Sequence, residues 1–325
     1  MSTASVTIHS SQFPAAVRRD LVESLRVRRV NHKFLYESFK QTQKWLALHE
    51  AHSPARIDID CLDAYDRAFV EAAAKISAKS IHIFGLGCGG GQKDTRLLRL
   101  LHSPGRELFY TPCDVGVAMA LVARQAALAV VPSQNCFPFV CDLATADNLA
   151  EVLVAHGPPS AARIMTFFGM IPNFEPELIL PRLATLVRSG DYLLFSANLA
   201  PGSNYAAGME RIRPQYDNTL TRDWLLAFLD EIGVERAVGG LFFTIEDGAM
   251  GLKRVLANFR FAQTVYVCVN GEEIGFASGE VLRLFFSYRY TPGHVEKLLL
   301  QHGLQVQAQW FTKSGEEGVF LCRRA

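Results

Sequence analysis

Short apolar runs alternate with amphipathic stretches through the middle of the chain. The apolar runs are rich in β-branched and aromatic residues, and they predict five strands, over residues 81–85, 108–113, 137–141, 163–168 and 192–197. The stretches between them repeat their apolar positions at helical spacing and predict helices over residues 94–101, 115–127, 146–155 and 176–187. Such alternation is typical of right-handed βαβ crossovers on a parallel sheet.

The first part of the chain follows a different pattern. Residues 17–51 carry aromatic and aliphatic side chains at spacings that predict one long helix, which ends at Ser53-Pro54. A second helix is predicted over residues 62–76. Residues 1–12 are polar and lack the basic and apolar regions of a signal peptide, so we expect a frayed tail.

The alternation also stops after residue 198 and resumes near the C-terminus. Asn270-Gly271 stands between two β-rich runs and indicates a hairpin with a type I′ turn. The last segment predicts a helix over residues 292–302 and two strands over 305–311 and 318–322, which form an antiparallel hairpin.

These patterns predict two structural units. The first is an α/β, Rossmann-like domain with a mostly parallel sheet and a C-terminal antiparallel hairpin, formed by residues 61–198 and 287–325. The second is an α+β lobe formed by residues 1–60 and 199–286, and we expect it to bind the substrate.

Composition narrows the range of partners. The 325 residues include 33 Lys and Arg against 32 Asp and Glu, so a net charge of +1 gives no field that attracts nucleic acid or an anionic membrane. No apolar run reaches the roughly 18 residues of a membrane-spanning helix. Seven cysteines without a CxxC pair argue against disulfides and zinc, and His49 and His52 have no clear third metal ligand. We expect a cytoplasmic protein that binds a small molecule and no metal.

A glycine-dense turn between a predicted strand and a helix is the most informative stretch. It reads Phe84-Gly-Leu-Gly-Cys-Gly-Gly-Gly-Gln-Lys93, and its glycines permit positive φ and close approach of a ligand to the backbone. Gly85, Gly87 and Gly90 satisfy G-x-G-x-x-G, which leaves an NAD site open as an interpretation. Gly85, Gly87, Gly89 and Lys93 are candidate cofactor residues.

Acidic residues end the next two predicted strands. Asp114 can accept hydrogen bonds from ribose hydroxyls, which both NAD and S-adenosylmethionine carry. Asp142, beside Leu143, suits an adenine amino group, and this second acid favours S-adenosylmethionine. The terminal hairpin favours it too, because methyltransferases of the Rossmann-like class close their sheet with an antiparallel last strand. Either aspartate could instead cap a helix.

With these residues in place, the chain from about residue 81 onward resembles the histidine-specific S-adenosylmethionine-dependent methyltransferases, which trimethylate the α-amino group of histidine on the route to ergothioneine. The resemblance rests on motifs that occur in the family's order: Gly87-Cys-Gly89 with Lys93, Tyr110 to Val115, Asp142-Leu143, Phe168-Gly-Met-Ile-Pro-Asn173-Phe, Gly190-Asp191-Tyr-Leu-Leu, Gln215-Tyr216-Asp217, Gly279-Glu280 and Ser287. It implies the fold of a class I methyltransferase.

The resemblance also implies roles for individual residues. Cofactor-binding roles are implied for Gly87, Lys93, Asp114, Asp142 and Leu143. Asn173 and Tyr216 would hold the amino-acid end of the substrate, and they are the candidate catalytic residues. Ser287 would contact the substrate's side chain.

Two departures from the family concern the substrate. The family has a glutamate two residues before the serine that matches Ser287, and this pair grips the imidazole, whereas this chain has Phe285. A paired tyrosine followed by Pro-Thr-Arg is replaced by Lys44-Trp45-Leu46-Ala47-Leu48. An unpaired buried imidazole N–H costs about 1–3 kcal/mol, so each lost bond predicts roughly 10–100-fold rejection of histidine. Phe285 and Trp45 suit an aromatic or aliphatic side chain instead.

Other interpretations remain open from the sequence. Asn173 could cap the helix that begins near Pro176, Tyr216 could be an ordinary core or surface residue, and Phe285 could serve packing alone. For the whole protein, the alternatives to an N-methyltransferase are an NAD-dependent oxidoreductase and a catalytically silent protein that binds S-adenosylmethionine and acts as a regulator.

Overall fold

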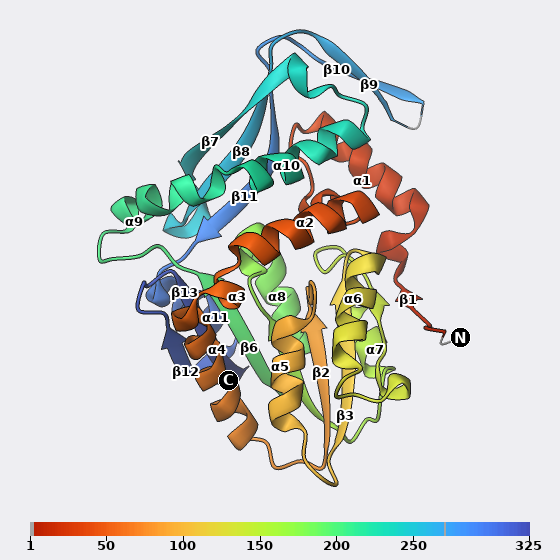
Figure 1. Ribbon diagram of the computed structural model, residues 1–325, viewed down its shortest axis with the longest axis vertical. Coiled ribbons are helices and arrows are strands. Elements are labelled where there is room, and N and C mark those ends of the chain that lie inside the picture. Colours follow the sequence, from red (N-terminus) through yellow and green to blue (C-terminus); the bar gives the residue numbers. More distant parts are fainter. Residues whose placement is uncertain (1–2, 270) are drawn as a thin grey trace.

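The computed structural model describes residues 3–269 and 271–325, and it is built around an eight-stranded sheet (Figure 1). Across the sheet the strands are β1 (Thr7–Ile8), β4 (Phe139–Val140), β3 (Glu107–Asp114), β2 (Ser80–Leu86), β5 (Ala162–Phe167), β6 (Tyr192–Asn198), β13 (Glu317–Arg324) and β12 (Leu304–Phe311). The first six strands pair in parallel, and β13 pairs antiparallel with both β6 and β12. The predicted α/β, Rossmann-like class with a C-terminal antiparallel hairpin is therefore confirmed.

Helices cover both faces of this sheet because both faces of its strands are apolar. On β2, Ile81 and Ile83 pack against one layer of helices, while Phe84 packs into the core on the other face. The first layer includes α4 (Ile59–Ala74) and α5 (Gln92–Leu101), with α6 (Val117–Ala127) beside them. The second layer consists of α7 (Leu149–Val154), α8 (Pro176–Leu186) and α11 (Pro292–Gln301). This arrangement leaves the carboxyl ends of the parallel strands uncovered by these helices.

A second lobe lies over those carboxyl ends, at the top of Figure 1. Its sheet has the order β11 (Val281–Arg289), β8 (Lys253–Phe261), β7 (Gly239–Asp247), all antiparallel, and a separate hairpin joins β9 (Val265–Val269) to β10 (Glu272–Phe276). The helices of the lobe are α1 (Pro14–Arg26), α2 (Phe39–His52), α9 (Tyr205–Ile212) and α10 (Thr219–Glu231), and the short α3 (Pro54–Ile57) leads down to α4. Trp224 and Phe228 of α10 pack with Phe34, Phe259 and Phe285 in one apolar core.

The N-terminal segment differs from the prediction in two ways. The single helix expected over residues 17–51 is wrong: α1 ends at Arg26, a 3-10 helix η2 (His32–Leu35) follows, and α2 begins at Phe39. Arg28 adopts a positive φ of 58°, and the Asn31 side chain accepts a hydrogen bond from the Lys33 backbone N–H, so the chain turns there.

The frayed tail expected over residues 1–12 is also wrong for the described part. Thr7 N donates to Pro138 O at 3.0 Å and His9 N donates to Val140 O at 2.8 Å, so β1 adds a strand to the edge of the main sheet. Two parallel backbone hydrogen bonds are too few to leave a periodic signal in the sequence.

The remaining segments follow the predicted order of elements. The five predicted strands, the helices between them and the C-terminal hairpin are all present, although β4 is reduced to two residues. The predicted hairpin is present as β9 and β10, while Asn270 of its turn lies outside the described residues. β11 runs without interruption through position 286, where the sequence analysis ended the second lobe.

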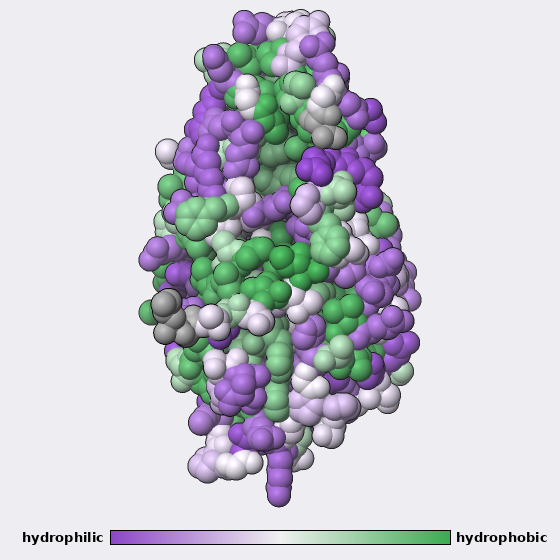
Figure 2. All heavy atoms as spheres, turned by 90° about the vertical axis from the view of Figure 1, so that its right-hand side faces the viewer, coloured by the Kyte–Doolittle hydropathy of each residue, from purple (hydrophilic) through white to green (hydrophobic). Residues whose placement is uncertain are grey.

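The molecular surface mixes hydrophobic and hydrophilic residues. On the face shown in Figure 2, the larger hydrophobic areas lie near mid-height. Within the described residues, every helix is too short or too polar to cross a bilayer.

Candidate functional site

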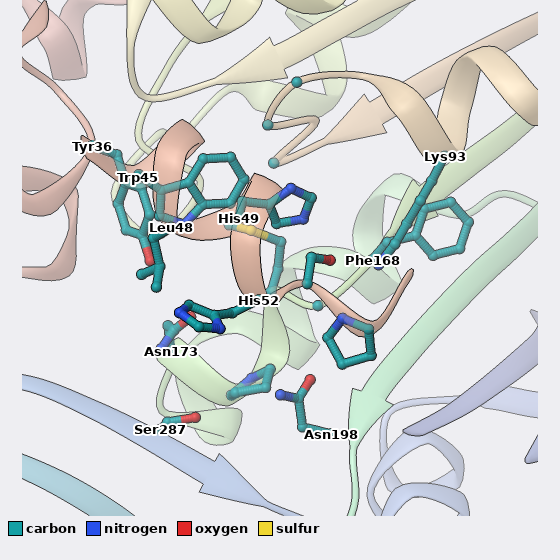
Figure 3. A pocket seen from close by; sticks show the side chains of 18 of the residues that line it. Tyr36, Trp45, Leu48, His49, His52, Lys93, Phe168, Asn173, Asn198 and Ser287 are labelled. Carbon is teal, nitrogen blue, oxygen red and sulfur yellow. The ribbon is translucent and has the colours of Figure 1, made fainter. Parts of the chain in front are cut away.

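A cavity of about 540 Å³ lies between the carboxyl ends of the parallel strands and the second lobe. It is lined by nearly all of the residues that the sequence predicted for a site: Gly87, Gly89, Lys93, Asp114, Asp142, Leu143, Asn173, Tyr216, Phe285 and Ser287. Figure 3 shows side chains of α2, of η4 (Ile171–Asn173) and of β11 around this space. The fold thus brings the two groups of candidates together in one cavity.

The glycine loop forms a narrow backbone turn at one end of the cavity. Gly87 N and Cys88 N both donate to Cys113 O, at 2.8 and 3.0 Å, which closes the turn against the end of β3. Gly87 has φ 70°, and a Cβ there would lie 2.5 Å from the Met170 side chain. Gly89 has φ 52°, and a Cβ there would lie 3.0 Å from the Trp45 ring. Only glycine satisfies both the backbone conformation and the space at Gly87.

Gly85 lies beneath this turn and not among the residues that line the cavity. A Cβ on Gly85 would lie 2.2 Å from Asp94 Oδ2. The same carboxylate accepts hydrogen bonds from Tyr110 at 2.7 Å and from Thr166 at 2.7 Å. The structure therefore gives Gly85 a packing role, in that it leaves room for a buried carboxylate under the loop.

Asp114 connects the end of β3 to the glycine loop. Its Oδ2 accepts a hydrogen bond from Gly89 N at 3.0 Å, and its Oδ1 accepts from Val115 N at 2.8 Å and from Gly116 N at 3.3 Å. Burial raises the pKa of Asp114 to about 6, against the opposing effect of these backbone donors. The N-cap of α6 is Gly116, so Asp114 is not a helix cap.

Asp142 lies just after β4, and within the described residues only one of its two carboxylate oxygens accepts a hydrogen bond. Oδ1 accepts a hydrogen bond from Ala144 N at 2.9 Å, and its own backbone N–H donates to Ser11 Oγ at 3.1 Å. Oδ2 is buried, has no hydrogen-bond partner within the described part of the chain, and lies 3.7 Å from Lys33 Nζ. Lys33 is itself fully buried and pairs with Asp20 at 2.5 Å.

Lys93, at the start of α5, reaches across to α4 and β13. Its Nζ donates to the Tyr65 hydroxyl at 2.8 Å, and that hydroxyl donates to Glu317 Oε1 at 2.6 Å. Burial, with the nearby Glu317 carboxylate, raises the pKa of Tyr65 well above its ordinary value. In Figure 3 Lys93 lies beside Phe168, on the side of the cavity opposite Tyr36 and Trp45.

Asn173 ends η4 and is anchored to the second lobe. Its Nδ2 donates to the backbone carbonyl of Phe286 on β11 at 2.8 Å. The N-cap of α8 is Glu175, and no side-chain bond caps that helix, so the capping interpretation of Asn173 is wrong. Because only the NH₂ group of an amide can donate to a carbonyl, this bond leaves Asn173 Oδ1 as the acceptor atom.

Three residues form a hydrogen-bonded chain at the lobe end of the cavity. The Tyr216 hydroxyl lies 2.8 Å from Ser287 Oγ, and Arg289 Nε donates to the same hydroxyl at 3.0 Å. Tyr216 belongs to the 3-10 helix η5 (Arg213–Tyr216), so these bonds join η5 to β11. Tyr216 is thus neither a free surface residue nor an ordinary core residue.

Phe285 serves packing and cavity lining at once. It is 8% exposed, its ring lies 5.6 Å from that of Trp224 and 6.4 Å from that of Tyr216, and it also lines the cavity. Trp45 stacks on His49 with ring centroids 4.6 Å apart and contacts the space over Gly89. Trp45 therefore borders the glycine loop.

The sequence analysis missed several residues of the cavity wall. Tyr36 of the segment after η2 lies 6.0 Å from Trp45 and 5.4 Å from Trp224, and burial raises the pKa of its hydroxyl. Asn198 ends β6 and points toward the space in Figure 3. Arg289 stands two positions after Ser287 and four after Phe285 on one strand, and this period of two is a signal that could have revealed it.

The cavity contains binding groups and no arrangement for covalent catalysis. Cys88 is half-buried in the cavity wall, and desolvation raises the pKa of its thiol well above the ordinary value, so it is a poor nucleophile at neutral pH. In the part of the chain that the structure describes, no three His, Cys, Asp or Glu side chains come together as metal ligands. The arrangement suits a reaction in which two bound molecules react with each other.

Comparisons with known proteins agree with this geometry at the level of the family. A family model described as histidine-specific methyltransferase, SAM-dependent, matches residues 17–233 and 249–324. No curated protein matches the chain.

Similar solved structures are remote. They include the CcbJ methyltransferase from Streptomyces caelestis, which is 16% identical over 81% of this chain and 95% of that chain, with a TM-score of 0.39. They also include a SAM-dependent methyltransferase from Methanosarcina mazei, 13% identical over 78% and 96%, with a TM-score of 0.42. A third is 1,6-didemethyltoxoflavin-N1-methyltransferase from Burkholderia thailandensis, 11% identical over 88% and 89%, with a TM-score of 0.42.

Proposed function

Because the chain belongs to the family of histidine-specific, S-adenosylmethionine-dependent methyltransferases, we propose that it methylates the α-amino group of an amino acid or related small amine other than histidine. Membership makes the protein an S-adenosylmethionine-dependent methyltransferase and excludes the NAD-dependent alternative. The proposal concerns the substrate and the residues that act on it.

The glycine-loop end of the cavity fits the cofactor. The unpartnered Oδ2 of Asp142 can accept the adenine amino group, Leu143 can pack beside the ring, and Asp114 can accept the ribose hydroxyls. The turn at Gly87 lets the cofactor approach the backbone, and Lys93 provides a positive charge for the carboxylate of S-adenosylmethionine. When bound, S-adenosylmethionine supplies an electrophilic methyl group on a positively charged sulfur.

The observation that carries the proposal is the orientation of Asn173. Its NH₂ group is used by the Phe286 carbonyl, so Oδ1 is the atom left to accept a hydrogen bond. An acceptor there can hold an N–H of a neutral amine and leave the lone pair on nitrogen free. Asn173 therefore acts by positioning the amine, and the amine's proton leaves to water.

Tyr216 and Phe285 support the choice of substrate class. Tyr216 is placed by Ser287 and Arg289, and its hydroxyl can orient the carboxylate end of an amino acid. Phe285 presents an apolar ring where the family's glutamate would grip an imidazole, which favours an aromatic or aliphatic side chain. The aromatic residues of the wall, among them Tyr36 and Trp45, can also contact a methylated ammonium through their ring faces.

The test is methylation of a defined mixture. The purified protein is incubated with S-adenosylmethionine, the common amino acids including histidine, and their decarboxylated amines, and products are identified by mass spectrometry with fragmentation to locate the methyl group. We expect N-methylation of one aromatic or aliphatic substrate and little on histidine. Histidine as the preferred substrate, or methylation away from the α-nitrogen, would contradict the proposal. S-adenosylhomocysteine binding without any product would favour a catalytically silent relative.

A further inference from the structure

We infer that Lys33 is a positioning residue for the cofactor: its buried ammonium holds Asp142 as a hydrogen-bond acceptor, so that the protein distinguishes adenine from a purine without the 6-amino group. This inference rests on the cofactor role proposed above for Asp142 and deepens it. Lys33 lies outside the motifs that carry the family resemblance, in a segment whose sequence predicted only a continuous helix.

The first observation is a lysine side chain that is completely removed from solvent. Lys33 is 0% exposed and belongs to η2 of the second lobe. Its Nζ donates to Asp20 Oδ2 at 2.5 Å and to Gln12 Oε1 at 3.4 Å. Because a buried charge is costly, an ammonium in this place indicates that the surrounding acceptors depend on it.

The second observation is the count of protons around this ammonium. An ammonium has three N–H groups, and Asp20 and Gln12 accept two of them. Asp142 Oδ2 lies 3.7 Å from Nζ, which is within the range of an ion pair and beyond that of a hydrogen bond. Oδ2 is buried and has no hydrogen-bond partner in residues 3–269 and 271–325. The negative charge of Asp142 is therefore stabilised by Lys33, while lone pairs of Oδ2 stay available to a ligand N–H.

The dependence on Lys33 is greater for Asp142 than for Asp20. Asp20 has a second cationic partner, Arg19 at 3.1 Å, and its side chain is 16% exposed. His32 lines the cavity and interacts with Asp142, but burial lowers its pKa from 6.5, so its ring is largely neutral at pH 7. Among the described residues, Lys33 is thus the positive group that Asp142 faces.

The third observation is that one N-terminal segment holds both residues. Ser11 Oγ accepts a hydrogen bond from Asp142 N at 3.1 Å, next to the pairing of β1 with β4. Gln12 accepts from Lys33 through Oε1 and donates through Nε2 to Val115 O at 2.9 Å. These bonds fix the lysine relative to the residues that follow β3 and β4, where the cofactor acids lie.

This arrangement decides which purine fits. A carboxylate oxygen beside an ammonium only accepts hydrogen bonds, and the 6-amino group of adenine donates one. Without Lys33, the buried Asp142 carboxylate has no positive partner within the described chain, and uptake of a proton removes that cost and makes the group a donor. Loss of Lys33 should therefore remove the preference for the amino group and leave the other contacts with the cofactor in place.

A purely structural role for Lys33 makes a different prediction. Its bond to Asp20 ties η2 to α1, and loss of that bond would lower stability and weaken all cofactor-like ligands equally. The experiment therefore compares two ligands that differ only in the 6-amino group.

Affinity is measured by calorimetry for S-adenosylhomocysteine and for its analogue with hydrogen in place of the 6-amino group. In the wild type we expect S-adenosylhomocysteine to bind roughly 10–100-fold more tightly, the range for one hydrogen bond to a charged group. Lys33→Met should abolish most of this preference and leave the affinity for the analogue nearly unchanged. Asp20→Asn is the matched control, because it breaks the same ion pair from the other side and should keep the full preference.

A double-substitution cycle tests whether Lys33 acts through Asp142. Asp142→Ala should abolish the preference by itself, and Lys33→Met in that background should cause no further loss. A further loss of preference in the double variant would show that Lys33 acts on the purine by another route and would contradict the inference.

The remaining outcomes are equally decisive. Equal affinity for the two ligands in the wild type, or a preference that survives in Lys33→Met, overturns the inference. Loss of the preference in Asp20→Asn also overturns it, and this result can be obtained even if Lys33→Met fails to fold.

The inference and the proposed function fail separately. The preference is measured without any substrate, so it is independent of which amine is methylated. Persistence of the preference in Asp142→Ala would remove Asp142 from the proposed cofactor site and the inference with it. Loss of the preference in Asp142→Ala together with its persistence in Lys33→Met would overturn the inference alone.

Discussion

The two ends of the cavity are built in different ways. At the glycine-loop end, the groups proposed to hold the cofactor are backbone atoms, two carboxylates and Lys93, and all but Lys93 lie at or just after the ends of the neighbouring strands β2, β3 and β4. At the lobe end they are side chains that meet over long separations: Asn173 and Phe286 are 113 positions apart, and Tyr216 and Ser287 are 71 apart. We therefore expect changes in the backbone to disrupt the glycine-loop end, and single side-chain substitutions to alter binding at the lobe end.

This difference has a chemical reason. A cofactor common to a whole family can be held by the strand ends of a conserved architecture, where parallel strands always present their carboxyl ends to one edge. At the lobe end the groups are side chains on a separate lobe, where a single substitution can change which substrate is held. The substitutions and the pH change below each perturb one end of the cavity.

The largest effect is expected from Asp114→Ala at the glycine-loop end. This change removes the acceptor of the Gly89 N–H and the acceptor proposed for the ribose hydroxyls. Two charged hydrogen bonds together contribute about 3–4 kcal/mol, so affinity for S-adenosylhomocysteine should fall at least 100-fold. Calorimetry measures the affinity. Asp63→Ala, which removes an exposed carboxylate paired with Arg67, is the control and should leave it unchanged. Unchanged affinity in Asp114→Ala would remove this residue from the cofactor site.

The second prediction alters the lobe end by Phe285→Glu. A carboxylate beside Ser287 restores a partner for an imidazole N–H, so binding of histidine should improve by roughly 10–100-fold while S-adenosylhomocysteine affinity stays constant. Calorimetry with histidine measures the gain. Since Phe285 also packs against Trp224, the variant will be less stable, and Phe285→Gln provides a control for that loss. No improvement in histidine binding would show that this strand position does not match the family's glutamate.

The third prediction uses the pKa of Asp114, which burial raises from 3.8 to about 6. A carboxyl group with a raised pKa binds its proton more tightly when folded, so its contribution to stability is greatest below pH 3.8 and is lost as the pH rises through 6. The affinity for the ligand changes with pH in the opposite direction, because the ionised carboxylate is a better hydrogen-bond acceptor than the protonated group. Affinity for S-adenosylhomocysteine should therefore rise about tenfold between pH 5 and pH 7 and then level off.

The groups around Asp114 do not account for that profile. Burial raises the pKa values of Tyr36 and Cys88, which keeps both neutral at these pH values, and burial lowers that of His32. Asp94 also has a raised pKa, and the Asp114→Asn variant separates the two carboxyl groups. A rise in affinity that persists in Asp114→Asn would assign the titration to another residue.

The smallest effect is expected from Ser11→Ala. Ser11 Oγ accepts a hydrogen bond from Asp142 N at 3.1 Å, so the N-terminal segment supports the glycine-loop end from outside the motif. Loss of this bond should lower the free energy of unfolding by about 1 kcal/mol, with at most a fewfold loss of S-adenosylhomocysteine affinity. Thermal and urea unfolding measure the change. Ser10→Ala, at an exposed neighbouring serine, should have no effect, and equal behaviour of the two variants would remove this support.

The order of strands and helices in the main domain was determined by the sequence itself, because periodicity is a local property and both faces of the sheet are apolar. The glycine loop, Asp114 and Asp142 could also be identified from the sequence, since each belongs to a short motif at the end of a strand. The resemblance to a family extended this to Asn173, Tyr216 and Ser287.

Tertiary structure alone decided the rest. β1 joins the sheet through backbone hydrogen bonds that no side-chain pattern encodes. The single helix predicted for the N-terminal segment is instead divided into α1 and α2, and between them Lys33 points inward to face Asp20 and Asp142. Gly85 does not line the cavity, and it leaves room for the buried carboxylate of Asp94, which comes from the next helix. Arg289 reaches the Tyr216 hydroxyl and Leu199 O because β11 packs against η5 and the end of β6, and such contacts depend on packing between distant segments rather than on spacing along the sequence.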